Sequence, residues 1–269
     1  MSCQGEPSGG AEEPRWSGPA SISVIIPALN EAARLGRTLA TTKAEGVEVI
    51  VADGGSRDAT PRIAARQGAQ VIASPPGRAR QMNAGASAAG GEILLFLHAD
   101  TLLPAGFAEE ARRLLAVPAV AAGAFRLSIR GGGWGLRLVE KAANWRAKKL
   151  WLPYGDQALF LRAELFRELG GFPELPVMED VALVRTLRRR GRIAIAPLTA
   201  ATSGRRWRER GIFRVTLVHQ AMLLGYLLHR PPDQLARWHQ GGHGFRNGRL
   251  PGNEPLPQVG IVDEDDDGL

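Results

Sequence analysis

The 269-residue chain has a single cysteine, Cys3, which excludes an internal disulfide and a cysteine-based metal site. The first twenty residues, MSCQGEPSGGAEEPRWSGPA, contain no apolar stretch of the kind that a secretory signal requires. We therefore expect a disordered leader over residues 1–20 and a cytoplasmic protein.

Signatures of several common chemistries are also missing. There is no Gly-x-Ser-x-Gly and no Gly-Lys-Ser/Thr phosphate loop. The segment PALNE, rather than Gly-x-Gly-x-x-Gly, follows the first predicted strand. No nucleophilic constellation is therefore indicated, and dinucleotide oxidoreduction is disfavoured.

Charge is unevenly distributed along the chain. The formal net charge is +7, and setting aside the five acids of residues 263–267 leaves +12 on residues 1–262. Such a basic body attracts nucleic acid, anionic lipid or a phosphorylated small molecule, but it is also compatible with a solvated, arginine-rich surface. Charge alone does not choose among these.

Strands and helices alternate in the first hundred residues. Apolar, β-branched runs predict strands over 21–27, 47–52, 69–74 and 92–100, with helical segments between them. Thr60 at the cap and Pro61 at the first helical position predict the start of one helix. This order indicates an α/β fold with a mainly parallel sheet flanked by helices.

The second half is less regular. Patterns predict strands over 119–129 and 192–203, helices over 134–152 and 179–191, and a strand leading into a helix over 156–172. An apolar helix over 211–229 opens a helical segment, 211–240, and an acidic tail over 241–269 is expected to be disordered. The apolar helix is short of the roughly 20 apolar residues that a membrane span needs.

Asp53 and Asp100 both stand at the carboxyl ends of buried, apolar strands of the same predicted polarity. Ligands of open α/β sheets bind outside the carboxyl ends of the strands, so both carboxylates would project into one crevice. Either residue alone could be a turn or helix-cap aspartate. Together they favour a functional site.

Four stretches, SVIIPALNE, VEVIVADGGSRDAT, FLHAD and MEDVAL, resemble the family 2 glycosyltransferases, which have the GT-A fold. The likeness covers residues 21–210, and GDQALFLR and SGRRWRERG resemble a small bacterial subgroup of that family. The resemblance implies an inverting, metal-dependent transfer of sugar from a nucleoside diphosphate sugar, with a UDP-sugar favoured, to an unidentified acceptor hydroxyl.

The resemblance also assigns the donor site. The nucleotide-sugar contacts that it implies are Pro27, Ala28, Glu31, Asp53, Arg78 and Arg80. The guanidinium fork of arginine suits a diphosphate. Glu31 could instead be an acid that stabilises a helix N-terminus, and the two arginines could be solvated loop residues.

A divalent cation, Mg²⁺ or Mn²⁺, is the cofactor implied. Family members usually have Asp-x-Asp where this chain has His98-Ala99-Asp100. Asp100 supplies the hard oxygen ligand, and His98, which would alternate with it on one face of an extended strand, is either a second ligand or a structural hydrogen-bonding residue.

Asp180 is the implied catalytic base, and Glu179 would orient it or bind the acceptor. Two adjacent acids also favour a helix start, which is the structural alternative. The acceptor or diphosphate would contact Gly155, Asp156, Gln157, Arg205, Arg206 and Trp207. The Arg-Arg-Trp cluster could also serve only to dock the last helix.

Two other functions remain open from sequence. A sugar nucleotidyltransferase would normally need a Gly-rich, basic first loop, which PALNE is not. A basic binding module for nucleic acid or anionic membrane would not need acids at the strand ends. We expect no nucleic-acid partner. The apolar helix is either a core helix or a contact with the inner face of the membrane, where the acceptor would be a lipid.

Overall fold

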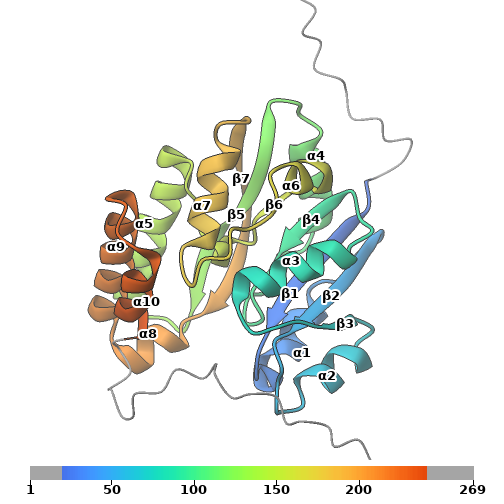
Figure 1. Ribbon diagram of the computed structural model, residues 1–269, viewed down its shortest axis with the longest axis horizontal. Helices are drawn as coiled ribbons and strands as arrows, with labels where there is room; N and C mark the ends of the chain where they lie inside the picture. The colour runs from blue at the N-terminus through green and yellow to red at the C-terminus, as the bar shows by residue number, and fades with distance from the viewer. Residues whose placement is uncertain (1–19, 241–269) are drawn as a thin grey trace, which may run out of the picture.

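The computed structural model describes residues 20–240. Within that range, seven strands form one sheet (Figure 1). They are β1 (Ile22–Ala28), β2 (Val47–Asp53), β3 (Gln70–Ala73), β4 (Ile93–Phe96), β5 (Val120–Arg130), β6 (Phe160–Arg162) and β7 (Arg192–Ser203). The strand order is β3-β2-β1-β4-β6-β5-β7, and β6 runs antiparallel to both of its neighbours while the other pairs are parallel.

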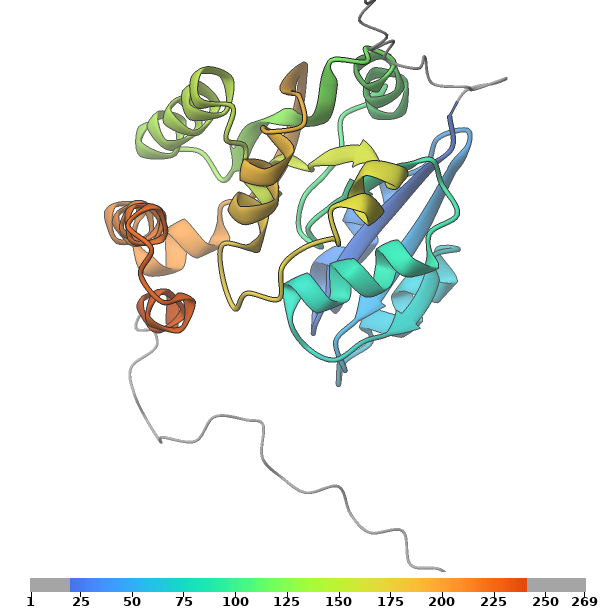
Figure 2. The same ribbon diagram turned by 45° about the horizontal axis from the view of Figure 1, so that its top comes forward.

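Helices cover both faces of the sheet (Figure 2). On one face lie α1 (Ala32–Ala40), α2 (Thr60–Arg66) and α4 (Phe107–Leu115), and on the other α3 (Arg78–Ala88), α6 (Ala163–Glu168) and α7 (Glu179–Leu187). At one end lie α5 (Trp134–Leu150), α8 (Arg205–Arg210), α9 (Ile212–Leu227) and α10 (Pro232–Gln240). The expected α/β architecture with a mainly parallel sheet is confirmed.

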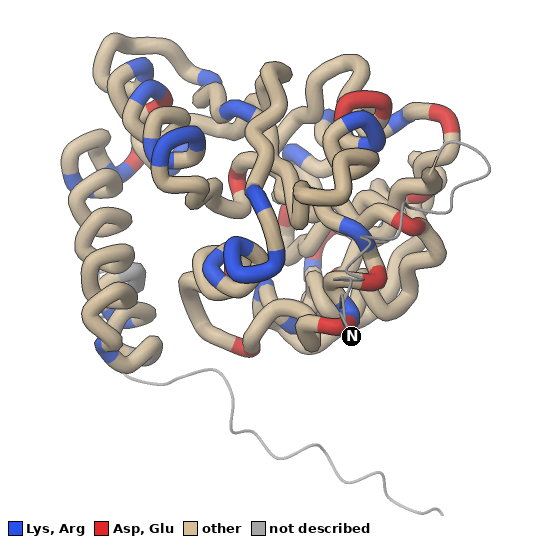
Figure 3. The backbone as a smooth tube through the Cα atoms, turned by 90° about the horizontal axis from the view of Figure 1, so that it is seen from above, with Lys and Arg blue, Asp and Glu red and all other residues tan. Residues whose placement is uncertain are grey.

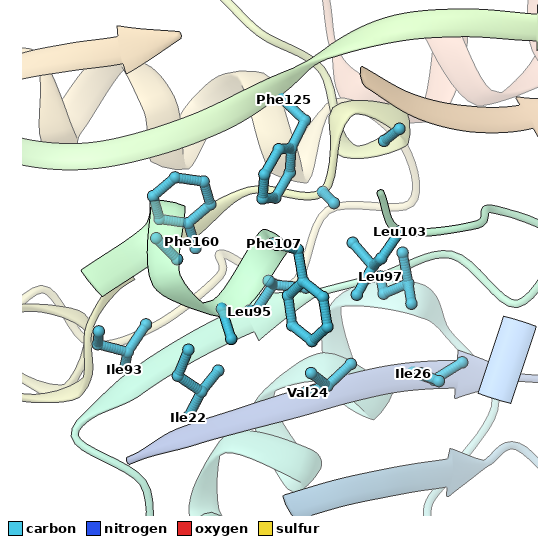
Figure 4. Close-up of a cluster of buried hydrophobic side chains, with 14 of the residues drawn as sticks. Ile22, Val24, Ile26, Ile93, Leu95, Leu97, Leu103, Phe107, Phe125 and Phe160 are labelled. Carbon is cyan, nitrogen blue, oxygen red and sulfur yellow. The ribbon is translucent and has the colours of Figure 1, made fainter. Parts of the chain in front are cut away.

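The apolar sequence of the central strands follows from burial on two sides. Side chains of Val24 and Ile26 on β1 pack with Leu95, Phe107 and Phe160 on one face, as Figure 4 shows. Ile25, between them in sequence, points into the cluster on the other face with α3 and α7. A strand covered on both faces loses the alternation of polar and apolar residues that an exposed sheet shows.

The close approach of α3 to β1 depends on Gly85. A β-carbon at Gly85 would lie 2.4 Å from Cγ2 of the fully buried Ile25, so only glycine allows this separation. The same helix carries Gln81, whose Nε2 donates hydrogen bonds to the carbonyls of Ala28 and Ala52, both at 2.8 Å. Gln81 thereby joins α3 to the carboxyl ends of β1 and β2.

Some local expectations are wrong. The strand expected over 92–100 ends at Phe96, and a turn follows at Ala99 and Asp100, where the Thr101 N–H donates to the His98 carbonyl at 3.0 Å. Thr60 does not cap α2; its hydroxyl instead accepts from the Glu31 N–H at 2.8 Å and thus holds the first loop.

The ends of the chain differ slightly from expectation. Ala20, placed in the leader by sequence, is buried, and its carbonyl accepts a hydrogen bond from Arg112 Nε at 2.7 Å. Residues 1–19 and the tail 241–269 lie outside the described residues. The helical segment 211–240 packs on the domain through Val215 and Met222, and α8 and α10, which the sequence patterns did not indicate, flank α9.

Replacing Gly85 by alanine tests the contact between α3 and β1. We expect Gly85→Ala to lower the free energy of unfolding by about 1–3 kcal/mol, because the added methyl overpacks against Ile25. Gly36→Ala in α1 is the matched control: its methyl would meet the flexible end of Gln67, so a gain of about 0.5–1 kcal/mol in helix propensity is expected. Equal effects in urea denaturation would contradict the close-packing interpretation.

Candidate active site

One pocket of about 440 Å³ lies at the carboxyl ends of β1 and β4. Its walls come from the loop after β1, the start of α3, the turn after β4, the segment before β6, the start of α7, the end of β7, and α8 and α9. The residues expected from sequence that line it are Pro27, Ala28, Glu31, Arg78, His98, Asp100, Asp156, Asp180, Arg205, Arg206 and Trp207. Segments far apart in the chain thus meet at the edge where ligands of α/β folds bind.

Asp53 lies next to this pocket. It pairs in register with Ala28, which lines the pocket, and its Oδ2 accepts hydrogen bonds from the N–H groups of Gly55 at 3.1 Å and Ser56 at 2.9 Å. Its Oδ1 is buried and has no hydrogen-bond partner among the described residues. Because a buried carboxylate oxygen normally has a donor, this atom is suited to accept from a ligand N–H.

The first loop is fixed by its own polar contacts. Asn30, with a left-handed φ of 55°, donates its N–H to Ser56 Oγ, and its Oδ1 accepts from the Arg57 N–H, each at 2.8 Å. Glu31 lines the pocket and also pairs with Arg34 at 2.9 Å. Glu31 stands at the N-cap of α1, but its side chain makes no capping hydrogen bond there.

His98 and Asp100 reach the pocket through the turn after β4, not through strand alternation. The turn is held by Arg130, whose Nη2 donates to the Asp100 carbonyl at 3.1 Å, and by the hydroxyls of Thr101 and Thr202 at 3.0 Å. Burial lowers the pKa of His98 to about 3, and the nearby cation Arg78 acts in the same direction. The imidazole is therefore neutral at pH 7, with a lone pair available.

Asp180 stands at the centre of the site. Its Oδ2 accepts a hydrogen bond from the Gly155 N–H at 2.7 Å, and its Oδ1 accepts one from the Val181 N–H at 2.8 Å. A β-carbon on Gly155 would lie 2.9 Å from His98 Nε2 and 3.2 Å from Asp180 Oδ2. Glycine at this position therefore allows the histidine and the aspartate to approach one backbone atom.

Asp156 is held in an unfavourable environment for a negative charge. Burial raises its pKa to about 6. The carboxylates of Asp180 and Asp100 act in the same direction, whereas nearby arginines oppose the rise. Its Oδ1 is buried without a hydrogen-bond partner in the described chain. Gly155 and Gln157 do not line the pocket: Gln157 is fully buried and donates to the Phe125 carbonyl at 3.0 Å.

Glu179 is buried and forms an ion pair with Arg78, which lines the pocket. Burial raises the pKa of Glu179, and Arg78 opposes this rise. Glu179 thus holds an arginine in place and does not itself line the pocket. Arg80 points away: its Nε pairs with the exposed Glu174 at 2.9 Å.

The end of β7 and α8 contribute the basic and aromatic wall. Arg205 pairs loosely with Glu209 at 3.5 Å, whereas burial lowers the pKa of Arg206 and Arg78 adds to this effect. Trp207 packs into an apolar cluster with Leu136 and Val215, yet its indole N–H is buried without an acceptor in the described residues. Trp207 therefore packs against α9, which was the alternative to a ligand contact, and it also lines the pocket.

Several pocket residues were missed from sequence. They are Gln81, Tyr154, Met178, Thr202, Ser203, His219 and Met222. Tyr154 adjoins the GDQ segment, and burial raises the pKa of its hydroxyl to about 12. His219 and Met222 lie on α9, far along the chain, and no local pattern marks them.

The side chains that could ligate a metal show whether the site suits a divalent cation. Within residues 20–240, no group of three or more His, Cys, Asp or Glu side chains is arranged to hold a metal. Asp100 nevertheless lines the pocket together with the carboxylates of Asp156 and Asp180. This set fits a cation held by one carboxylate and completed by substrate phosphates and water, the usual arrangement for Mg²⁺.

Comparison with known proteins identifies the family. The model of glycosyl transferase family 2 matches residues 23–170, more than half of the chain, and the chain belongs to this family. Proteins named uncharacterized glycosyltransferases from Mycobacterium tuberculosis and Mycobacterium bovis are 39% identical over 87 residues. That match spans 32% of this chain and 39% of each relative.

Solved structures share the fold. A mannosyltransferase from Pyrobaculum calidifontis in complex with GDP-mannose and Mn²⁺ superposes with a TM-score of 0.61 at 23% identity, over 84% of this chain and 72% of that one. Glucosyl-3-phosphoglycerate synthase from Mycobacterium tuberculosis, in complex with Mn²⁺, UDP-glucose and phosphoglyceric acid, has a TM-score of 0.56 at 23% identity, over 79% and 81%. These likenesses establish a GT-A fold.

Replacing Asp156 tests whether the folded protein raises the pKa of this carboxyl group. A raised carboxyl pKa destabilises the folded state as pH rises from about 4 through 6, because the folded protein resists losing that proton. We expect Asp156→Asn to be about 1–3 kcal/mol more stable than wild type at pH 8, with the difference vanishing near pH 4. The exposed Glu174→Gln should change stability by less than about 0.5 kcal/mol at either pH. Equal wild-type and Asp156→Asn denaturation curves at pH 8 would contradict the assignment.

Proposed function

We propose that this protein is an inverting, metal-dependent glycosyltransferase that moves a sugar from a nucleoside diphosphate sugar to an acceptor hydroxyl. The observation that carries the proposal is the meeting of three carboxylates, Asp100, Asp156 and Asp180, with Arg78 and Arg206 in one pocket. A transferase of this kind must neutralise a diphosphate and also remove a proton, so it needs charges of both signs.

The nucleoside end of the donor would lie along the first loop. The buried, unpartnered Oδ1 of Asp53 supplies an acceptor for a base N–H, beside Pro27 and Ala28. Structural neighbours bind donors of two kinds, GDP-mannose and UDP-glucose. Uracil and guanine each present an N–H to a carboxylate, and we favour a UDP-sugar.

The diphosphate would lie between Asp100 and the arginines. Asp100, with His98 beside it, would hold a divalent cation, which supplies charge neutralisation for the departing phosphate. Arg78, fixed by the buried Glu179, would donate hydrogen bonds to phosphate oxygens, and Arg206 adds positive charge from the wall that α8 forms. Arg205 lines the same wall.

Asp180 would act as the base. Each of its oxygens accepts one backbone hydrogen bond, so the carboxylate is oriented while lone pairs remain for the acceptor hydroxyl. As the acceptor oxygen attacks the anomeric carbon, Asp180 takes its proton and the bond from that carbon to the diphosphate oxygen breaks. This single displacement inverts the anomeric centre.

The proposed division into a transferase domain, 21–210, and a helical segment, 211–240, agrees with where the pocket residues lie. Residues 21–210 hold every candidate catalytic and donor-binding residue, and 211–240 closes the pocket with His219 and Met222. The family match favours transfer over the nucleotidyltransferase and the non-catalytic binding module.

Substitution of the base should separate chemistry from binding. We expect Asp180→Asn to reduce nucleoside diphosphate release from UDP-glucose, UDP-GlcNAc or GDP-mannose at least 100-fold, with donor affinity unchanged within about threefold. Coupled detection of released UDP or GDP measures turnover, and calorimetry measures binding. Glu109→Gln, an exposed acid on α4, is the control and should retain full turnover. Full turnover by Asp180→Asn would remove it as the base.

Substitution of Asp100 tests the metal. Wild-type protein should gain thermal stability from nucleoside diphosphate and Mn²⁺ together, as a ligand that binds only the folded state requires. We expect Asp100→Ala to lose most of this metal-dependent increase in Tm. An undiminished increase in the variant would show that the cation is held elsewhere, and His98→Ala would then be the next variant to measure.

A further inference from the structure

The outer side of α9 is apolar. Its exposed positions recur at helical spacing, and Phe213, Leu217 and Leu224 are 83, 71 and 59% exposed. Leu227 and Leu228 continue the same side to the end of the helix. A helix on the surface of a soluble domain normally turns polar residues toward water, so this stripe is the reverse of the usual pattern.

The neighbouring helix α5 has a second apolar stripe on its exposed side. Trp134, Leu138 and Trp145 are 78, 61 and 60% exposed, and Trp151 follows the helix end at 47%. Tryptophan has an apolar ring with one polar N–H and is enriched where lipid meets water. Scattered exposed apolar residues are common, but this many on two adjoining helices mark an interaction surface.

The two helices lie side by side at one end of the molecule (Figures 1 and 2). They touch where Gly135 meets Ile212, whose Cδ1 would lie 3.0 Å from a β-carbon added at Gly135. We call the exposed sides of Trp134–Leu150, with Trp151, and Ile212–Leu227, with Leu228, the α5/α9 surface. It lies outside the pocket and uses none of the proposed catalytic residues.

The charge on this surface has one sign. Lys141, Lys148 and Lys149 on α5 are exposed, whereas the acid of α5, Glu140, is buried and paired with Arg137. The sequence of α9 contains no acid. Figure 3 marks basic residues in blue and acidic ones in red, and a further basic run lies at 188–190. The combination of exposed tryptophan, leucine and lysine is complementary to an anionic bilayer surface.

We propose that the α5/α9 surface docks the protein onto an anionic lipid bilayer, with both helices lying along the interface. No helix within residues 20–240 is long and apolar enough to cross a bilayer. A second copy of the chain is a poorer occupant, because self-association would bring the lysines of the two copies together. Nucleic acid would use the lysines but gain nothing from the leucine stripe.

Docking would place the pocket beside the lipid surface. The opposite side of α9 carries His219 and Met222, which line the pocket. One helix therefore separates the apolar surface from the proposed active site. An acceptor exposed at the bilayer surface would have a short path to Asp180; this consequence rests on the proposed function, whereas bilayer docking does not.

Vesicle binding by the full chain tests the proposal. We expect co-sedimentation with vesicles of phosphatidylglycerol and phosphatidylcholine, and weaker binding to phosphatidylcholine alone. Trp134→Ser with Trp145→Ser, or Phe213→Ser with Leu217→Ser, should each lower the partition coefficient by about tenfold or more. Lys141→Gln with Lys148→Gln should reduce the preference for anionic vesicles and its sensitivity to salt.

Val117→Ser is the matched control, because Val117 is 45% exposed at the end of α4, away from the α5/α9 surface. It should bind vesicles as wild type does, and circular dichroism should show that every variant is folded. Brominated lipid should quench the tryptophan fluorescence of wild type, and less so after removal of Trp134 and Trp145. Absence of vesicle binding by wild type, or equal binding by all variants, would overturn the proposal. So would sedimentation showing a wild-type dimer that the serine variants convert to monomer.

Discussion

The site depends on the gathering of three carboxylates in one partly buried pocket beside arginines. Asp100, Asp156 and Asp180 share one pocket, and the burial of Asp156 with the other two acids nearby raises its pKa to about 6. Such an arrangement costs free energy in the empty protein, and a cation with a bound diphosphate would recover that cost. The raised pKa of Asp156 is what the proposed cation site leads us to expect.

The fold holds these charges in place with backbone contacts and close packing. Gly85 allows α3 to lie directly on β1, and Gln81 of that helix joins the ends of β1 and β2. Gly155 gives its N–H to Asp180 and leaves room for His98. Glu179, which is buried, positions Arg78 at the pocket. These residues therefore shape the candidate site indirectly, by positioning the side chains and strands that line it.

Much of this could be predicted from sequence because strand burial and strand-end acids are local signals. The apolar runs gave β1, β2 and β7 nearly at their observed bounds. The strand-end acids at 53 and 100, and the acids at 156 and 180 that the family resemblance implied, all lie at or beside the pocket. His98 and Asp100 were placed on an extended strand, however, whereas the backbone turns after Phe96. Apolar periodicity does not reveal where a strand stops pairing.

The parts that could not be predicted depend on tertiary contacts. Glu179 was expected to orient Asp180 or to bind the acceptor, and Arg80 to contact the donor or to be a solvated loop residue. Each instead forms an ion pair with a partner about a hundred residues away, which no local pattern encodes. His219 and Met222 reach the pocket only because α9 packs back over α7. The apolar sequence of α9 was compatible with either a core helix or a membrane contact. Only the exposure of its outer side distinguishes these two roles.

Calorimetric titration of UDP and of GDP into the wild-type protein, with Mn²⁺ and then with EDTA, tests the central claim most directly. Binding of one nucleotide in preference to the other, present with Mn²⁺ and lost with EDTA, is the predicted result. Absence of binding by both nucleotides under either condition would contradict a donor site formed by Asp53, Asp100 and Arg78, and would leave a GT-A fold without the proposed chemistry.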